Sequence, residues 1–229
     1  MATRISLKRL LAIILGLIGA AFVLTPFFVE AALAREAVRV AIELLLVLAV
    51  WKAGADRRLL AAVGGVALLN EVTHWLLRLG PHPGLVLLDG GCTLAFIATT
   101  AGFMARTAWS QESVGAESLI GAVAVYFLIG YFWAVVFSLI EFGSPGSFSS
   151  ICAPLPDGML DCRPEIASFP KLTYFSFVSM TTLGYGDVVP LTPPAEGVAA
   201  MAAVSGQLFL AMVIGRLVSL YVGQKSASS

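Results

Sequence analysis

Residues 181–187 read Thr181-Thr182-Leu183-Gly184-Tyr185-Gly186-Asp187. They follow a short apolar run, 169–181, and precede a much longer one, 195–221. The short run cannot cross a hydrocarbon core of about 30 Å and suits a re-entrant helix, whereas the long run can span it. Backbone that leaves the helical path at membrane depth is tolerated only where protein buries it or where it lines water.

Two glycines flank the aromatic residue of this segment. Glycine readily takes positive φ, and residues that alternate between left- and right-handed conformations turn successive carbonyls to one side of an extended strand. Four such strands around an axis would stack rings of oxygens, and such rings replace the water shell of a dehydrated cation. Gly184 and Gly186 therefore favour an ion-binding backbone.

The composition is that of a membrane protein. Hydrophobic residues make up 59% of the 229 residues and charged residues 12%, about half the charged fraction of a soluble domain. Six apolar segments are long enough to span a bilayer: 10–28, 34–52, 59–79, 85–104, 118–142 and 195–221. The sequence predicts an all-α, polytopic membrane protein in a lipid bilayer. Its formal net charge of zero gives no indication of a nucleic-acid partner.

Basic residues gather before the first segment and in every second connection after it, which places them on one side of the membrane. They are Arg4, Lys8 and Arg9, then Lys52, Arg57 and Arg58, then Arg106, and finally Arg216 and Lys225. Positive charge marks the cytoplasmic side. We therefore expect both termini in the cytoplasm and the 143–168 loop outside, in the plasma or inner membrane of the cell.

Two features of the predicted outer and N-terminal regions stay open. Residues 1–34 have a basic start, an apolar run and Ala32-Leu33-Ala34, which resembles a leader that is cleaved. The run is longer than an ordinary leader's, which favours a retained helix. Cys152 and Cys162 share the 143–168 loop, where they form either a disulfide or two free thiols.

The segment Thr182-Leu183-Gly184-Tyr185-Gly186 resembles the Thr-Val-Gly-Tyr-Gly filter of potassium channels, with Leu183 in place of valine. The resemblance continues backwards through 177–181 and forwards through 187–190. It implies a pore domain, 118–222, with an outer helix 118–142, a pore helix 169–181, a filter 182–187 and an inner helix 195–221. The chain is similar to short bacterial six-transmembrane members of this family.

The resemblance assigns roles to individual residues. The carbonyls of Thr182, Leu183, Gly184 and Tyr185, with the Thr182 hydroxyl, would bind K⁺, and Gly186 would shape the outer mouth. Thr181, Asp187, Tyr174 and Val178 would support the filter. The pore helix would aim the negative end of its dipole at the ion. One filter per chain implies a homotetramer.

The chain departs from the family pattern in the predicted pore helix, which lies behind the filter. Many relatives have two tryptophans where Tyr174 and Phe175 stand. The Tyr174 hydroxyl could bond Asp187 and brace the outer mouth, which predicts a filter with fewer lateral bonds. The alternative is simple aromatic packing.

The inner helix carries the predicted gate and cavity residues Gly206, Gln207, Leu210, Ile214 and Gly215. Gly206 lies twenty residues beyond Gly186, where related channels place a hinge, and a mid-helix glycine weakens a helix by about 1 kcal/mol. Close helix packing is the alternative. Gln207 either faces a water-filled cavity or bonds a neighbouring helix.

Residues 1–109 form the predicted four-helix N-terminal transmembrane domain, in the place of a voltage sensor. Voltage sensing needs a row of basic residues on one helix. Segment 85–104 has no Lys or Arg, and its one charge is Asp89. We therefore expect no steep voltage gating.

The same domain carries an intramembrane polar cluster of Arg39, Glu43, Glu71, His74 and Asp89. Counting about 1.5 Å per residue, Glu43 and Glu71 share one depth, and the other three share another. Buried ionisable groups at matching depths usually pair. The cluster is either a static polar lock or a proton sensor that acts through His74. Metal binding by Glu71 and His74 is a less favoured hypothesis, since two ligands rarely suffice to hold a metal ion.

The sequence thus predicts a K⁺-selective channel subunit that conducts passively and needs no cofactor beyond the permeant ion. Fewer than ten residues follow the last segment, so no soluble ligand-binding domain is expected. No nucleophile, metal cluster or phosphate loop indicates an enzyme. Two alternatives stay open: a subunit of a K⁺ uptake transporter, and a silent regulatory or sensory membrane subunit.

Overall fold

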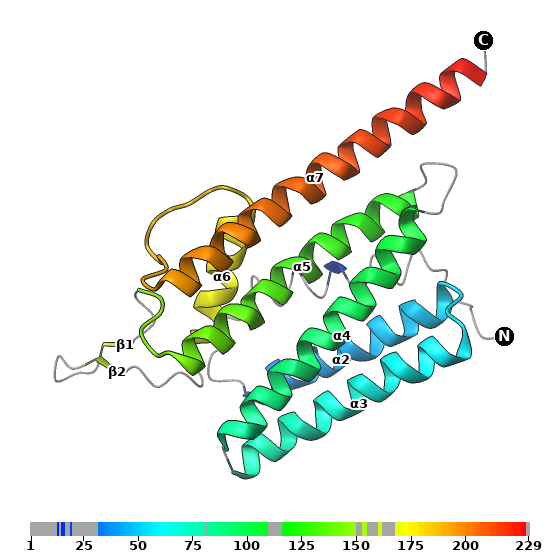
Figure 1. The fold of residues 1–229 in the computed structure, drawn as a ribbon. Coiled ribbons are helices and arrows are strands. Elements are labelled where there is room, and N and C mark those ends of the chain that lie inside the picture. Colours follow the sequence, from blue (N-terminus) through cyan, green and yellow to red (C-terminus); the bar gives the residue numbers. More distant parts are fainter. Residues whose placement is uncertain are drawn as a thin grey trace.

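The computed structural model describes residues 13, 15, 16, 19, 32–80, 82–109, 116–149, 153, 154, 160, 161 and 168–227. Its helices are α2 (Ala32–Lys52), α3 (Arg57–Leu79), α4 (Pro83–Trp109), α5 (Ala116–Gly143), α6 (Ser168–Met180) and α7 (Pro193–Ala227), and its strands are β1 (Ala153–Pro154) and β2 (Leu160–Asp161) (Figure 1). Most of the predicted segment 10–28, and both loop cysteines, Cys152 and Cys162, lie outside the described residues.

Among the described residues, four helices are long and apolar enough to cross a bilayer, which confirms the prediction of an all-helical, multi-pass membrane protein. They include Arg57–Leu79, Pro83–Thr107, Leu119–Gly143 and Pro193–Ser219. α6 has only 13 residues, about 20 Å of helix, which is shorter than a hydrocarbon core. The two-residue antiparallel pair β1–β2, in the loop between α5 and α6, was not predicted.

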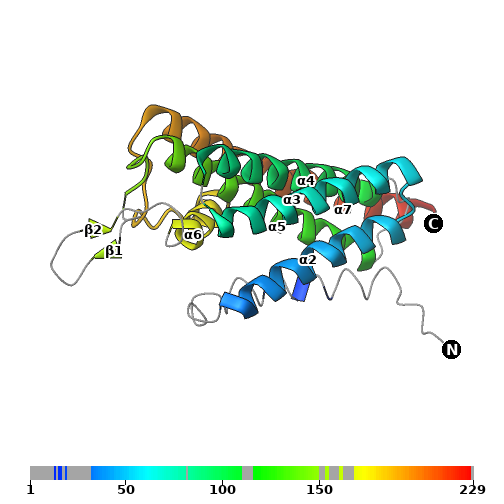
Figure 2. The same ribbon diagram turned by 90° about the horizontal axis from the view of Figure 1, so that it is seen from below.

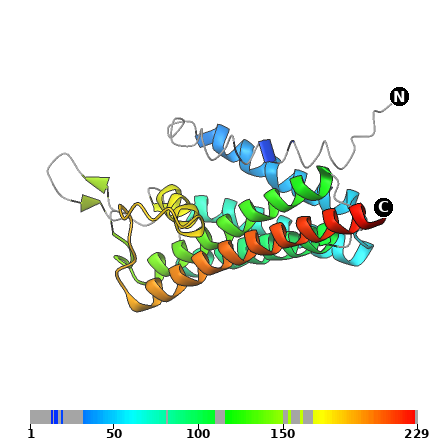
Figure 3. The same ribbon diagram turned by 90° about the horizontal axis from the view of Figure 1, so that it is seen from above.

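The long helices run roughly lengthwise beside one another, and α6 lies near one end of them. Figures 1 and 3 place α6 beside α5 and the N-terminal part of α7, with the β1–β2 pair beyond it and the C-terminal end of α7 at the opposite end. Figure 2 shows α2 on one side of the molecule, against α3 and α4. α5 is the central element, because α4, α6 and α7 all pack on it.

Two hydrophobic cores follow from this arrangement. The larger one joins α2, α3, α4 and α5 and includes Leu46, Val50, Val63, Phe96, Leu128 and, from α7, Phe209. The smaller one lies between α5, α6 and α7 and consists of Phe137, Phe148, Leu172, Phe175, Val188, Ala195 and Ala202. Because Val188 follows residues 182–187 directly, the smaller core anchors the C-terminal end of that segment.

The ends of α7 and α3 follow from local chemistry. Pro193 and Pro194 open α7, at positions where proline's fixed φ is already helical and its missing N–H costs nothing. Asp56 caps α3, since its carboxylate accepts a hydrogen bond from the backbone N–H of Leu59 at 2.8 Å.

The contact between α5 and α6 depends on a glycine. A Cβ atom at Gly130 would lie 2.4 Å from the Phe177 ring. That ring packs against Phe127 and Tyr131, with centroids 5.4 and 6.1 Å apart. The Ser176 hydroxyl donates to the Gly130 carbonyl at 2.5 Å. Only a residue without a side chain lets α6 approach this closely.

Gly130→Ala is therefore expected to lower the free energy of unfolding by about 1–3 kcal/mol, the usual effect of overpacking a core. Gly102→Ala is the matched control, because Gly102 is exposed on α4 and a Cβ there meets no atom within 4 Å. That control should be neutral or slightly stabilising. Thermal unfolding of both variants in detergent checks the prediction, and equal midpoints would contradict it.

Candidate functional site

The backbone of residues 182–186 alternates in the sign of φ. Thr182, Gly184 and Gly186 have φ of 58°, 57° and 76°, whereas Leu183 and Tyr185 have no positive φ. This is the alternation that turns successive carbonyls to one side. Its first member was not predicted, because threonine is β-branched and strongly avoids positive φ. Holding Thr182 there costs about 1–3 kcal/mol.

The end of α6 holds this segment through backbone hydrogen bonds. The Val178 carbonyl accepts the N–H groups of Leu183 at 3.0 Å and Gly184 at 3.4 Å, and the Ser179 carbonyl accepts the N–H of Thr182 at 3.0 Å. The helix therefore supplies the acceptors that an irregular backbone would otherwise lack. Val178, a predicted support residue, acts through its main chain.

The two threonines bond locally in this structure. The Thr181 hydroxyl donates to the Phe177 carbonyl at 2.7 Å, which closes the last turn of α6. The Thr182 hydroxyl donates to the Thr181 carbonyl at 2.6 Å.

Residues 181–187 are exposed in the single chain. The side chains of Leu183 and Tyr185 are 53% and 67% exposed. On α7, Leu210 and Ile214 are exposed apolar residues as well. Gly215 is also exposed, and a Cβ there meets no atom within 4 Å. Residues 181–187 and three of the predicted gate residues, Leu210, Ile214 and Gly215, are thus uncovered in the single chain.

Tyr174 lies beside Tyr185 and Asp187. Its ring stacks on Tyr185, with centroids 6.5 Å apart and planes 7° from parallel. Partial burial raises the pKa of the Tyr174 hydroxyl, and the nearby Asp187 carboxylate raises that pKa further. Phe175 instead packs in the smaller core, 5.1 Å from Phe137.

A brace that sequence reasoning missed begins at the end of α5. The buried carboxylate of Glu141 accepts the backbone N–H groups of Gly146 at 2.7 Å and Phe148 at 3.1 Å. Phe148 then pairs with Pro190 as an isolated bridge. The signal in the sequence is a lone carboxylate in the last turn of an apolar helix, a position with no dipole to favour it.

The brace continues along the chain that follows the filter. Ser149 donates its backbone N–H to the Val189 carbonyl, and its hydroxyl accepts from the Val189 N–H, both at 2.9 Å. The N–H of Leu191 donates to the Ser147 carbonyl at 2.8 Å. Residues 188–191 are therefore fixed from the α5 side while the end of α6 fixes residues 182–184.

Two contacts bear on the alternatives for the inner helix. A Cβ at Gly206 would lie 2.7 Å from the Met180 carbonyl oxygen, so this glycine permits close packing. The Gln207 amide donates to the same carbonyl at 2.9 Å, and this bond joins α7 to the end of α6.

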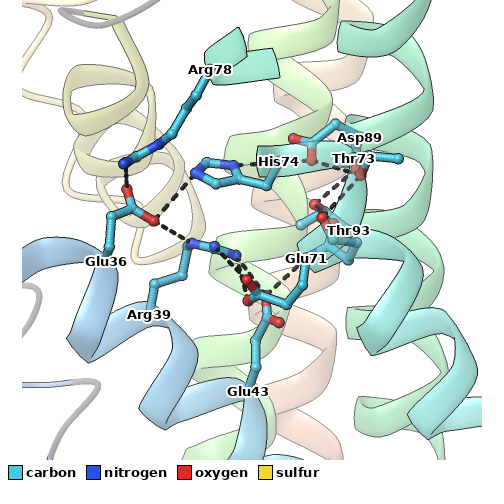
Figure 4. A network of polar contacts seen from close by, with 10 residues as sticks. Glu36, Arg39, Glu43, Glu71, Thr73, His74, Arg78, Asp89 and Thr93 are labelled. Carbon is cyan, nitrogen blue, oxygen red and sulfur yellow. Dashed lines mark hydrogen bonds and ion pairs between the residues drawn. The ribbon is translucent and has the colours of Figure 1, made fainter. Parts of the chain in front are cut away.

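The structure brings all five residues of the predicted polar cluster into one network (Figure 4). Arg39 lies at its centre. Its guanidinium contacts the carboxylates of Glu36 at 3.1 Å, Glu43 at 3.2 Å and Glu71 at 3.0 Å. One arginine thus joins α2 to α3.

His74 links the other half of the network. Its Nε2 lies 3.2 Å from Glu36 and its Nδ1 4.0 Å from Asp89. Arg78 also pairs with Glu36, at 2.5 Å. Arg39 therefore bridges the two predicted depths. Glu36, which was not singled out although it lies three residues before Arg39, joins Arg39 to His74.

Neutral side chains complete the network. Asn70 donates to Glu43 at 2.8 Å and accepts from Thr93 at 2.7 Å, and Thr73 donates to Asp89 at 3.0 Å. These bonds connect α2, α3 and α4. Within the part of the chain that the structure describes, no group of three or more His, Cys, Asp or Glu residues is arranged to hold a metal ion.

Comparisons with known proteins agree with this geometry. Residues 91–222, more than half of the chain, match the family described as Ion channel. The chain is 32% identical over 114 residues to the Caenorhabditis elegans potassium voltage-gated channel protein shk-1. The matched region covers 48% of this chain and 19% of that protein. It is 39% identical over 67 residues to the human voltage-gated potassium channel regulatory subunit KCNG1, which covers 29% of this chain and 13% of that protein. The chain spans less than a fifth of these relatives.

The network yields a stability prediction. Arg39→Leu leaves the carboxylates of Glu36, Glu43 and Glu71 without their shared cation, and we expect a loss of about 3 kcal/mol in unfolding free energy. Arg106→Leu, the same change at an exposed position on α4, should alter it by less than about 0.5 kcal/mol. Denaturant unfolding in lipid–detergent mixtures measures both. A loss no larger for Arg39 than for Arg106 would show that the network contributes little.

Proposed function

The chain belongs to the ion channel family, and we propose that it is a subunit of a K⁺-selective channel that conducts K⁺ passively across the membrane. The observation that carries the proposal is the alternating φ of residues 182–186, at the C-terminal end of a helix too short to span the bilayer. Stacked backbone carbonyls replace the hydration shell of K⁺. The ion would bind the carbonyls of Thr182, Leu183, Gly184 and Tyr185, with Gly186 at the outer mouth.

The proposed assembly is a homotetramer. Each chain contributes one filter, and a ring around an axis needs several copies. Residues 181–187 and, on α7, Leu210 and Ile214 are uncovered in the single chain, which supports this assembly. A larger exposed apolar patch on a protein normally marks an interaction surface.

The proposed topology has six spans and one re-entrant loop, with both termini cytoplasmic and the 143–168 loop outside, in the plasma or inner membrane. α6 would enter from the outer side and point its C-terminal end at the ion, where the partial negative charge of a helix terminus favours a cation. The proposed pore domain comprises residues 118–222, and the proposed N-terminal domain residues 1–109.

Steep voltage gating is not part of the proposal. α4 carries no Lys or Arg before Arg106. The arginines near the outer half of the domain, Arg39 and Arg78, are both held in ion pairs with Glu36. A voltage sensor needs basic residues that move through the field.

A second candidate function is that of a regulatory subunit. It is favoured by the relatives named as regulatory subunits, KCNG1 among them. Such a chain would assemble with a different channel subunit and pass no ions alone. The third possibility, a K⁺ uptake transporter, is less favoured because the chain contains a single filter.

Flux from purified protein in liposomes tests the proposal. We expect K⁺ efflux with no energy source, little Na⁺ flux and a complex of four chains. Gly184→Ala should reduce K⁺ flux by an order of magnitude or more, because its φ of 57° costs an L-residue about 1 kcal/mol or more in each of four copies. Gly102→Ala, the same change in open space on α4, should retain wild-type flux.

Each other outcome selects a different function. A stable complex that passes neither ion would favour the regulatory subunit, and ion movement that requires an energy source would favour the transporter. Equal K⁺ and Na⁺ flux from wild-type protein would refute K⁺ selectivity.

A further inference from the structure

The last carbonyls of α6 differ in their partners. The carbonyls of Phe177, Val178 and Ser179 accept backbone N–H groups from residues 181–184. The Met180 carbonyl, the final one of the helix, accepts instead from the side-chain amide of Gln207, at 2.9 Å. Carbonyls at a helix C-terminus lack intrahelical partners and are satisfied by other groups. Here α7 supplies a cap for α6 from 27 residues away.

The position of this cap is fixed by close packing. A Cβ at Gly206 would lie 2.7 Å from the Met180 carbonyl oxygen and 2.9 Å from the Met180 Cβ. Met180 and Gly206 are both buried. One residue earlier, the Ser205 hydroxyl accepts from the Trp133 indole N–H at 2.8 Å. Residues 205–207 therefore bind α7 to both α5 and α6.

We propose that Gln207 is a positioning residue that holds the Met180 carbonyl, and with it the inner end of residues 181–187, to α7. The hydrogen bond is independent of any function, whereas its effect on ion flux rests on the proposed channel function. Residues 205–207 then act as a fixed clamp and Gly206 as a contact glycine rather than a hinge. Displacement of α7 at this level would be passed to the base of the filter.

The bond also affects the charge that a cation meets. The last carbonyl of a helix carries part of the negative end of its dipole. An amide donor on that carbonyl opposes part of this charge and keeps the oxygen turned toward α7. Removing the donor would free the oxygen and change both the field and the geometry below Thr181.

The bond can be observed without any ion flux. Met180 and Thr181 form the only Met-Thr pair in the sequence, so carbonyl-¹³C methionine with ¹⁵N threonine gives one correlated NMR signal from this peptide bond. We expect Gln207→Met, which keeps the side-chain length and removes the donor, to shift the Met180 carbonyl resonance. Gln224→Met, the same change further along α7, should leave it in place. An unmoved resonance in Gln207→Met would overturn the inference.

Flux measurements then test the consequence. Gln207→Met should lower K⁺ flux by roughly tenfold and reduce the K⁺ to Na⁺ ratio. Gln207→Glu should conduct like wild type at low pH, where a protonated carboxyl donates a hydrogen bond, and lose flux as the pH rises and the carboxylate loses its proton. The wild-type flux over the same pH range is the reference against which this loss is measured. If Gln207 served folding alone, the flux of Gln207→Glu would not change with the protonation of this side chain.

The two proposals fail separately. Wild-type protein that passes no K⁺ would refute the channel function, while a shifted resonance in Gln207→Met would still establish the clamp. Conducting wild-type protein with a Gln207→Met variant of equal flux and selectivity would refute the positioning role. A Gln207→Glu variant whose flux does not change with pH would also refute it.

Discussion

The structure around residues 182–187 depends on one constraint: a backbone without regular secondary structure must still find partners for its N–H groups. The hydrocarbon region of a bilayer contains no water that could accept hydrogen bonds from these N–H groups. The Val178 carbonyl instead accepts from both Leu183 and Gly184. This bond pattern requires a helix that ends directly before the segment, which is why α6 and the filter form one unit. The positive φ of Thr182 is then the strain that this tight junction imposes.

The unit is supported from three sides, and α5 provides two of them. Its glycine at 130 admits the Phe177 ring, which sets the depth of α6. Its terminal carboxylate at Glu141 folds the following loop back onto residues 188–191. The third side is α7, through Gln207. Because each support consists of a few specific contacts, the position of residues 182–187 is determined by residues that lie outside the motif itself.

Sequence patterns predicted the helical segments and the alternating filter, because apolar run length and glycine placement act locally. They also selected the five residues of the polar cluster by depth along each helix. They could not select Glu36, Thr73 or Glu141, since these residues matter through partners on other elements whose rotation about the helix axis sequence does not determine. The choice between a hinge and a contact at Gly206 likewise depended on the distance to Met180.

The charges of the N-terminal domain argue for a rigid role. Arg39 holds carboxylates on both α2 and α3, and moving one helix past the other would separate these charges at membrane depth. Breaking a buried ion pair costs several kcal/mol, while one elementary charge gains only about 2.3 kcal/mol per 100 mV. With no basic residue on α4 before Arg106, the membrane field has little to act on. In the proposed channel, the domain would therefore act as a rigid support for α5.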